Sequence, residues 1–223
     1  MTNFESLAAK YDQWFKGDAG SYADSMEKRL IIKLLQPQKG QSLLDIGCGT
    51  GHYLFFFKEL GLKVKGIDSS ESMLEVARKK LGSEWELHSG KAELLPFSNH
   101  SFDIISLITS LEFVSDPVRA LREAARVARR KIVLGVLNKH SILGWQRRFV
   151  GLFKQTIYKP ARFYHIRELK NLIKQTMDYS NLNWESVLFF PHKWPKFLRK
   201  FERFFSFRKN PFGAFLCLVV ELK

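Results

Sequence analysis

Residues 43–51 read LLDIGCGTG, an apolar run that leads into three glycines at alternate positions. The apolar residues are typical of a short buried strand, and the glycines let the backbone turn sharply into a following helix. Because glycine carries no side chain beyond its α-carbon, a ligand can approach the chain closely at this turn. The segment therefore predicts a strand–turn–helix unit that binds a nucleotide-like ligand.

The spacing of Gly47, Gly49 and Gly51 distinguishes between two kinds of nucleotide site. Proteins that seat a pyrophosphate on a helix N-terminus use the wider pattern G-x-G-x-x-G. Asp45, two positions before the first glycine, is unhelpful to a pyrophosphate and suits a cationic ligand. We therefore expect the loop, including Cys48, to bind S-adenosylmethionine. The alternative is an ordinary strand–helix turn without a ligand.

Asp68 comes 17 residues after Gly51, at the end of the next predicted strand. A carboxylate in this position can accept hydrogen bonds from both ribose hydroxyls of a nucleotide. The alternative role is to cap the following helix, and the two roles are compatible. We include Asp68 and its neighbour Ser69 among the cofactor-binding residues, and expect Ser69 or Ser70 to cap that helix.

Outward from the loop, strand and helix patterns alternate over residues 42–138. Five strands separated by helices predict parallel β–α–β units, because each crossover needs a helix to span it. Two more strands follow near the C-terminus. We expect an α/β, doubly wound, seven-stranded and mostly parallel sheet, with ligands beyond the carboxyl ends of its strands. The predicted strands span residues 42–46, 63–67, 85–88, 102–108, 131–137, 182–190 and 214–222.

The composition is that of one globular domain over residues 1–223, with 45% hydrophobic and 26% charged residues. The apolar run at residues 214–220 is much shorter than the roughly 20 residues of a membrane-spanning helix. No signal peptide is visible, and two distant cysteines predict no disulfide framework. The six histidines lack ligand spacing, so no metal is expected. These features predict a cytoplasmic protein.

The formal net charge of +14 is concentrated in the second half of the chain. Residues 1–115 hold 13 Lys and Arg against 15 Asp and Glu, whereas residues 116–223 hold 23 against 7. The second half therefore faces an acidic substrate, a nucleic acid or an anionic membrane, and charge alone does not separate these.

Two segments, residues 139–165 and 191–212, depart from the alternating pattern and combine aromatic with basic residues. We expect them to be variable elements of a helical cap, with helices over residues 141–158 and 164–177. Their apolar faces either cover the sheet or form an interfacial surface that reaches a lipid-like acceptor at a membrane. An RNA-binding face with stacking aromatics ranks last, because no recognised RNA-binding module accompanies it.

Five motifs occur in a characteristic order, at residues 43–51, 64–68, 90–97, 101–105 and 116–127. In this order the chain resembles class I S-adenosylmethionine-dependent methyltransferases, of the type 11 group that includes the ubiquinone- and menaquinone-biosynthesis enzymes. The resemblance implies a Rossmann-like methyltransferase fold, with S-adenosylmethionine as cofactor and S-adenosylhomocysteine as product. It also implies that Ala92 and Glu93 lie beside the adenine. Tyr11, in N-terminal helices over residues 1–40, would close the cofactor site.

Two features depart from that family. Lys91 stands where an acidic residue commonly contacts the adenine, and residues 128–131 replace the usual Pro-Gly-Gly turn. The methyl transfer step needs little chemical assistance from the protein, because a sulfonium is already an activated leaving group. The protein has mainly to align the acceptor with the methyl group. By analogy with the fold, the residues just after the fourth strand, Thr109, Ser110, Leu111 and Glu112, lie nearest the methyl group. We expect Thr109 to contact the cofactor and Glu112 to be a base or substrate anchor; the alternative is a solvated loop residue.

The leading functional hypothesis is methyl transfer to a small-molecule or lipid-like acceptor, for which the basic cap would favour an anionic compound. Peripheral contact with a membrane accompanies this hypothesis. The alternatives are an RNA methyltransferase and a catalytically silent protein that only binds S-adenosylmethionine.

Overall fold

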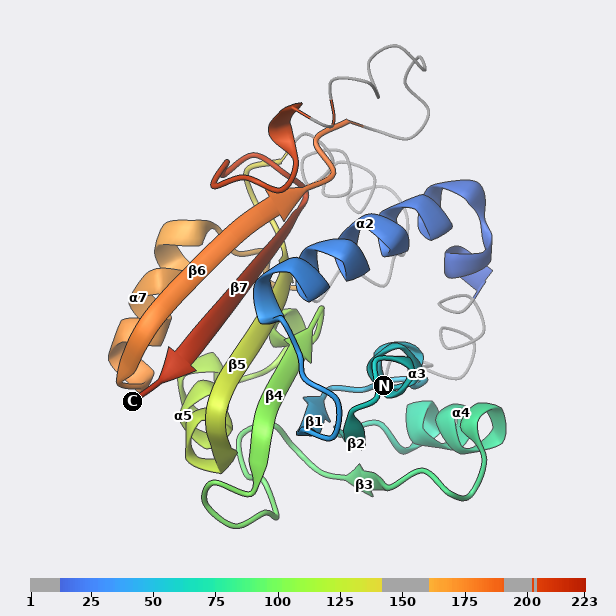
Figure 1. The fold of residues 1–223 in the computed structure, drawn as a ribbon. Helices are drawn as coiled ribbons and strands as arrows, with labels where there is room; N and C mark the ends of the chain where they lie inside the picture. The colour runs from blue at the N-terminus through green and yellow to red at the C-terminus, as the bar shows by residue number, and fades with distance from the viewer. Residues whose placement is uncertain (1–12, 142–160, 191–201, 203) are drawn as a thin grey trace.

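The computed structural model describes residues 13–141, 161–190, 202 and 204–223. Seven strands form one sheet in the order β3-β2-β1-β4-β5-β7-β6 (Figure 1). Neighbours from β3 to β5 pair in parallel, whereas β7 is antiparallel to both β5 and β6. The predicted seven-stranded, mostly parallel sheet is therefore confirmed. The strands are β1 (Ser42–Ile46), β2 (Lys63–Asp68), β3 (Leu87–Ser89), β4 (Phe102–Ile108), β5 (Ala128–Leu137), β6 (Tyr179–Val187) and β7 (Phe215–Leu222).

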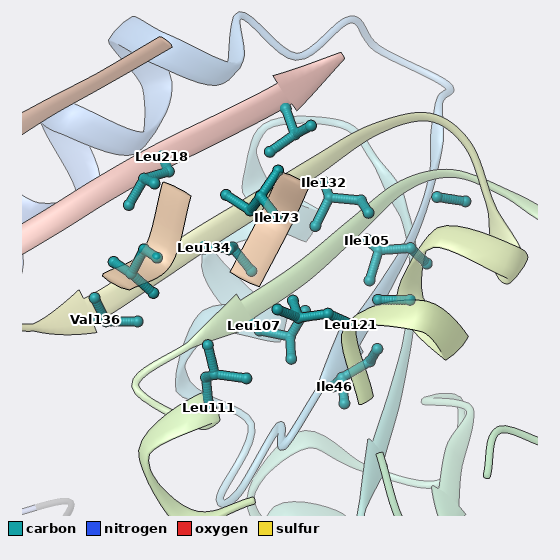
Figure 2. Packing of buried hydrophobic residues seen from close by; sticks show 14 of the residues in the cluster. Ile46, Ile105, Leu107, Leu111, Leu121, Ile132, Leu134, Val136, Ile173 and Leu218 are labelled. Carbon is teal, nitrogen blue, oxygen red and sulfur yellow. The ribbon is translucent and has the colours of Figure 1, made fainter. Parts of the chain in front are cut away.

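Helices cover both faces of the sheet, as a doubly wound fold requires. On β5, Ile132 and Leu134 pack in one cluster with α5 and α7 residues, while Val133 between them packs in a second cluster with α2 and α3 residues. Figure 2 shows the first cluster, with Leu121 of α5 and Ile173 of α7 against the sheet. The longer helices are α2 (Asp18–Leu35), α3 (His52–Glu59), α4 (Glu71–Leu81), α5 (Pro117–Val127) and α7 (Ile166–Thr176).

Side-chain caps define the starts of α4 and α5, and the first of them confirms the predicted cap at Ser70. The hydroxyl of Ser70 accepts a bond from the backbone N–H of Met73 at the start of α4. Asp116 accepts one from the N–H of Arg119 at 3.0 Å, with Pro117 as the first residue of α5. These caps pair backbone N–H groups in the first turn that would otherwise have no acceptor, and they fix the residue at which each helix begins.

The connection from β3 to β4 corrects the expectation that a helix spans every crossover. Residues 90–101 contain turns and no helix. Side chains of α5 hold this segment instead: the guanidinium of Arg126 donates to the carbonyls of Leu95 and Phe97, and Glu123 accepts from the N–H of Leu95. A bonded loop thereby performs the bridging role of the missing helix.

Several element boundaries also differ from the predicted ones. Strand β5 begins at Ala128, so residues 128–131, which replace the Pro-Gly-Gly turn, extend the strand. Strand β6 ends at Val187, earlier than predicted, because Leu188 adopts a left-handed backbone with φ 68°. The predicted helix at 164–177 is confirmed as α7, whereas the one at 141–158 lies outside the described residues except for its first residue.

Candidate functional site

The glycine loop has a backbone that other residues rarely adopt, with φ of 74° at Gly47, 54° at Gly49 and 80° at Gly51. A β-carbon on Gly47 would lie 2.4 Å from the β-carbon of Ser110. One on Gly51 would lie 2.4 Å from Cδ1 of Leu81. At Gly49, by contrast, a β-carbon would meet no atom of the described residues within 4 Å. The outer glycines therefore allow close packing, whereas Gly49 borders open space that a ligand can enter.

Asp68 ends β2 and connects the loop to the next helix. Its Oδ2 accepts a hydrogen bond from the N–H of Gly49 at 2.8 Å, and its Oδ1 accepts one from the N–H of Ser70 at 2.8 Å. Burial raises the pKa of Asp68, although these bonds oppose the shift. Each oxygen has a further lone pair, so the geometry permits ribose hydroxyls as additional donors. Ribose binding, and the role of the exposed Ser69, stay predictions.

Asp45 lies in β1 just before the loop and is only 3% exposed. The hydroxyl of Ser106 on β4 donates a hydrogen bond to its Oδ1 at 2.6 Å. Burial raises the pKa of Asp45 to about 7; the Ser106 bond opposes this shift and the charge of Asp68 adds to it. A buried carboxylate is costly without a partner, so this position favours a cationic ligand.

Three other predicted cofactor residues have side chains engaged elsewhere. The thiol of Cys48 packs in a small core cluster with α3 and α4, and burial raises its pKa well above the usual value. Oε1 of Glu93 accepts bonds from the backbone N–H groups of residues 115–116. Ala92 packs against the main core. Their predicted contacts with the cofactor therefore depend on backbone atoms or on the remaining surface of these side chains.

The chain turns abruptly after β4. Thr109 has φ 49°, rare for a β-branched residue, and its N–H donates to the carbonyl of Gly135 at 2.7 Å. The turn places Ser110 against Gly47 and leads into the short helix η1 (Leu111–Phe113). Backbone strain of this kind is frequent at functional sites. The predicted contact of Thr109 with the cofactor stays a prediction.

Glu112 is 2% exposed, so the alternative of a solvated loop residue is wrong. Its Oε1 accepts a hydrogen bond from the N–H of Leu137, at the end of β5, at 2.7 Å. Its Oε2 and the hydroxyl of Ser110 are buried and have no hydrogen-bond partner among the described residues. Burial raises the pKa of Glu112 to about 8 against the effect of the Leu137 bond. Buried polar atoms without a partner are rare in folded proteins. Ser110 packs against Gly47 of the glycine loop, and Glu112 follows two residues later in η1.

Sequence reasoning missed a further buried carboxylate, that of Glu27 in α2. It is 5% exposed and accepts a hydrogen bond from the hydroxyl of Tyr53 at 2.8 Å. Its negative charge adds to the raised pKa of Glu112. The signal was its position on the apolar face of α2, four residues after Ala23 and four before Ile31.

The N-terminal segment reaches the helix that follows the loop. The ring of Phe15 stacks on His52, with centroids 3.9 Å apart, and Nε2 of His52 lies 2.6 Å from Oδ1 of Asp24. Although burial opposes it, the bonds from His52 and Lys28 lower the pKa of Asp24. Tyr11 lies outside the described residues, so its closure over the cofactor stays a prediction.

Together, these features define a nucleoside site of the class I methyltransferase type. Open space at Gly49 gives room for the ligand, while Asp45 and Asp68 offer carboxylates at the carboxyl ends of adjacent parallel strands. A cation and a pair of ribose hydroxyls match these groups, so the residues present fit S-adenosylmethionine.

Comparisons with known proteins agree with this class. A family model described as a methyltransferase domain matches residues 44–134. A demethylmenaquinone methyltransferase of Listeria monocytogenes is 31% identical over 171 residues, covering 72% of this chain and 71% of the relative. An uncharacterized protein of Methanocaldococcus jannaschii is 32% identical, covering 85% and 86%. The crystal structure of a Thermotoga maritima S-adenosylmethionine-dependent methyltransferase, titled a possible histamine N-methyltransferase, has TM-score 0.77 at 28% identity, covering 99% and 98%.

The chain belongs to the class I S-adenosylmethionine-dependent methyltransferases, in the group that includes the demethylmenaquinone methyltransferases. The predicted fold, cofactor and reaction class are confirmed. Within the described part of the chain, no helix is both long and apolar enough to cross a bilayer.

We expect affinity for S-adenosylmethionine to fall about tenfold from pH 7.5 to about pH 6. Burial raises the pKa of Asp45 to about 7, so the free protein takes up a proton there in this range, and a bound cation favours the ionised form. The pKa of Asp45 is also higher in the folded than in the unfolded protein, so its contribution to the free energy of unfolding is greatest at low pH and is lost as the pH rises towards 7. Calorimetry across this range measures the affinity.

The matched variant for this test is Asp45→Asn, whose affinity should vary much less over the same interval. An equal loss of affinity in both proteins would show that another group titrates.

Proposed function

We propose that the protein transfers a methyl group to a small, lipid-like acceptor whose reacting atom carries a proton, and that Glu112 removes this proton. The buried carboxyl of Glu112, with one oxygen unpaired among the described residues, is the observation that carries the proposal. Relatives named for demethylmenaquinone make a lipid-like acceptor the first choice.

Each residue of the site has a stated role in the proposal. Gly49 leaves room for the cofactor and Asp68 accepts the ribose hydroxyls. Asp45 complements the positive charge, and S-adenosylmethionine supplies an activated methyl group when bound. Ser110 can donate its free hydroxyl to the acceptor, because no described residue bonds it. These contacts align the reactants, which is most of what the reaction requires.

Proton removal gives the buried carboxyl of Glu112 a chemical task. A base is most effective when its pKa lies near the working pH, and burial raises the pKa of Glu112 to about 8. The acceptor atom would bond to the methyl carbon as the methyl–sulfur bond breaks, with the neutral thioether S-adenosylhomocysteine as the leaving group. The proton of the acceptor atom would move to Oε2 of Glu112, while Oε1 stays bonded to the N–H of Leu137. The rate should therefore rise with pH until Glu112 is ionised in the free enzyme.

The acceptor class is tested with S-adenosylmethionine labelled in its methyl group, added to the protein and a cell extract. We expect the label to enter a solvent-extractable fraction, and Gly49→Leu protein to give none. Label in RNA would replace the proposal with an RNA methyltransferase. Cofactor binding without any labelled product would point to a catalytically silent protein.

A further inference from the structure

The connection between β6 and β7 lies at the same edge of the sheet as the candidate site. In the strand register, Leu137 at the end of β5 and Val187 at the end of β6 both pair with Phe215 at the start of β7. Glu112 binds the N–H of Leu137 and so marks this edge. Figure 1 shows the described part of the connection at the end of β6 and β7 that is remote from the C-terminus.

In this connection, large exposed apolar side chains alternate in sequence with exposed basic side chains. Phe204, Phe205 and Phe212 are 63%, 42% and 59% exposed, and Arg208 and Lys209 between them are also exposed. We call these five residues the aromatic ridge. Exposure of phenyl rings to water is unfavourable for the folded protein. Three exposed rings within nine residues of one connection therefore favour a surface that contacts a partner.

The backbone that carries the ridge is held firmly. The carboxylate of Glu202, 2% exposed, accepts bonds from the N–H groups of residues 188–190 and from the hydroxyl of Ser206. The amide of Asn138, also buried, donates to the carbonyls of Pro211 and Gly213. Two buried polar side chains thus fix a loop that carries exposed phenyl groups, which preorganises the surface for contact.

We propose that the aromatic ridge docks onto an anionic lipid surface. Phenyl rings partition into the boundary between headgroups and acyl chains, while Arg and Lys are attracted to the negatively charged headgroups. The excess of 23 basic over 7 acidic residues in 116–223 gives the same half of the chain the matching charge. Exposed phenyl rings and cations are also found where proteins stack on RNA bases, so RNA binding is the alternative outcome of the test below.

Docking would also bring the candidate site close to the lipid, because the ridge and Glu112 share one edge of the sheet. This extends the proposed function, since a lipid-like acceptor could then enter from the membrane. The docking itself needs neither cofactor nor acceptor. It can therefore fail while methyl transfer succeeds, and the reverse.

Cosedimentation of the whole protein with vesicles tests the proposal. We expect binding to phosphatidylcholine vesicles that contain phosphatidylglycerol, weak binding to phosphatidylcholine alone, and release by high salt. The double variant Phe204→Ser with Phe212→Ser, and separately Arg208→Glu with Lys209→Glu, should each lower binding about tenfold or more. Phe55→Ser on α3 and Lys79→Glu on α4 are controls, because both residues are exposed away from the ridge.

Unchanged affinity for S-adenosylhomocysteine shows that the ridge variants are folded. Binding that is equal with and without phosphatidylglycerol would overturn the proposal, as would controls that weaken it as much as the ridge variants. Loss of RNA binding in the ridge variants, without vesicle binding by the wild type, would replace it with an RNA-binding surface.

Discussion

Replacing Gly49 by leucine is expected to weaken binding of S-adenosylhomocysteine by about 100-fold or more. The leucine side chain would extend into space where no atom of a described residue lies within 4 Å of a β-carbon. It would therefore occupy the volume that the cofactor needs, and its β-carbon would not collide with the described residues. The positive φ of 54° makes any side chain unfavourable here by about 1 kcal/mol, which a folded domain tolerates.

Gly40→Leu is the matched control for this experiment. Gly40 also has a positive φ, 86°, and a β-carbon there would meet no atom within 4 Å in the part of the chain that the structure describes. Gly40 precedes β1, however, and so lies at the opposite edge of the sheet from the glycine loop. Calorimetric titration should give wild-type affinity for Gly40→Leu and none measurable for Gly49→Leu. Equal affinity in the two variants would place the cofactor elsewhere.

Glu112→Gln is expected to slow methyl transfer by about 100- to 10,000-fold while affinity for S-adenosylhomocysteine stays the same. Glutamine keeps an oxygen that can accept the N–H of Leu137, so the turn after β4 should be preserved. It cannot take a proton from the acceptor. The wild-type rate should rise with pH towards about 8, where burial places the pKa of Glu112, and this rise should vanish in the variant.

Glu202→Gln makes the same chemical change at a carboxyl that is also 2% exposed. In the wild type, the carboxylate of Glu202 accepts a hydrogen bond from the N–H of Leu188 in the connection between β6 and β7, outside the candidate site. With an acceptor dispersed in detergent, this control should keep the wild-type rate per folded molecule. If Glu112→Gln were as active as the wild type, Glu112 would be a structural residue and the proposed base would be rejected.

The local parts of the site could be predicted from sequence because their cause is local. A glycine loop after an apolar strand specifies its own geometry, and Asp68 follows at the end of the next strand. The caps at Ser70 and Asp116 likewise involve residues three positions apart. Short-range constraints of this kind are visible in the order of residues alone.

The buried state of Glu112 could not be predicted in the same way. Its carboxyl is bonded by the N–H of Leu137, 25 residues further along, and its raised pKa also reflects the charge of Glu27 in a helix that precedes the sheet. The helix-free crossover at residues 90–101 has a similar cause, since Arg126 holds it from a later helix. Both the burial of Glu112 and the helix-free crossover depend on tertiary contacts, which cannot be inferred from the alternation of strand and helix patterns in the sequence.

The most direct measurement of the central claim is a crystal structure of the protein with S-adenosylhomocysteine. We expect the ribose hydroxyls within hydrogen-bond distance of the Asp68 carboxylate and the homocysteine chain beside Gly49. The sulfur should face Ser110 and Glu112 across the end of β4. A nucleoside bound at any other edge of the sheet, with the loop at residues 47–51 left empty, would contradict the account.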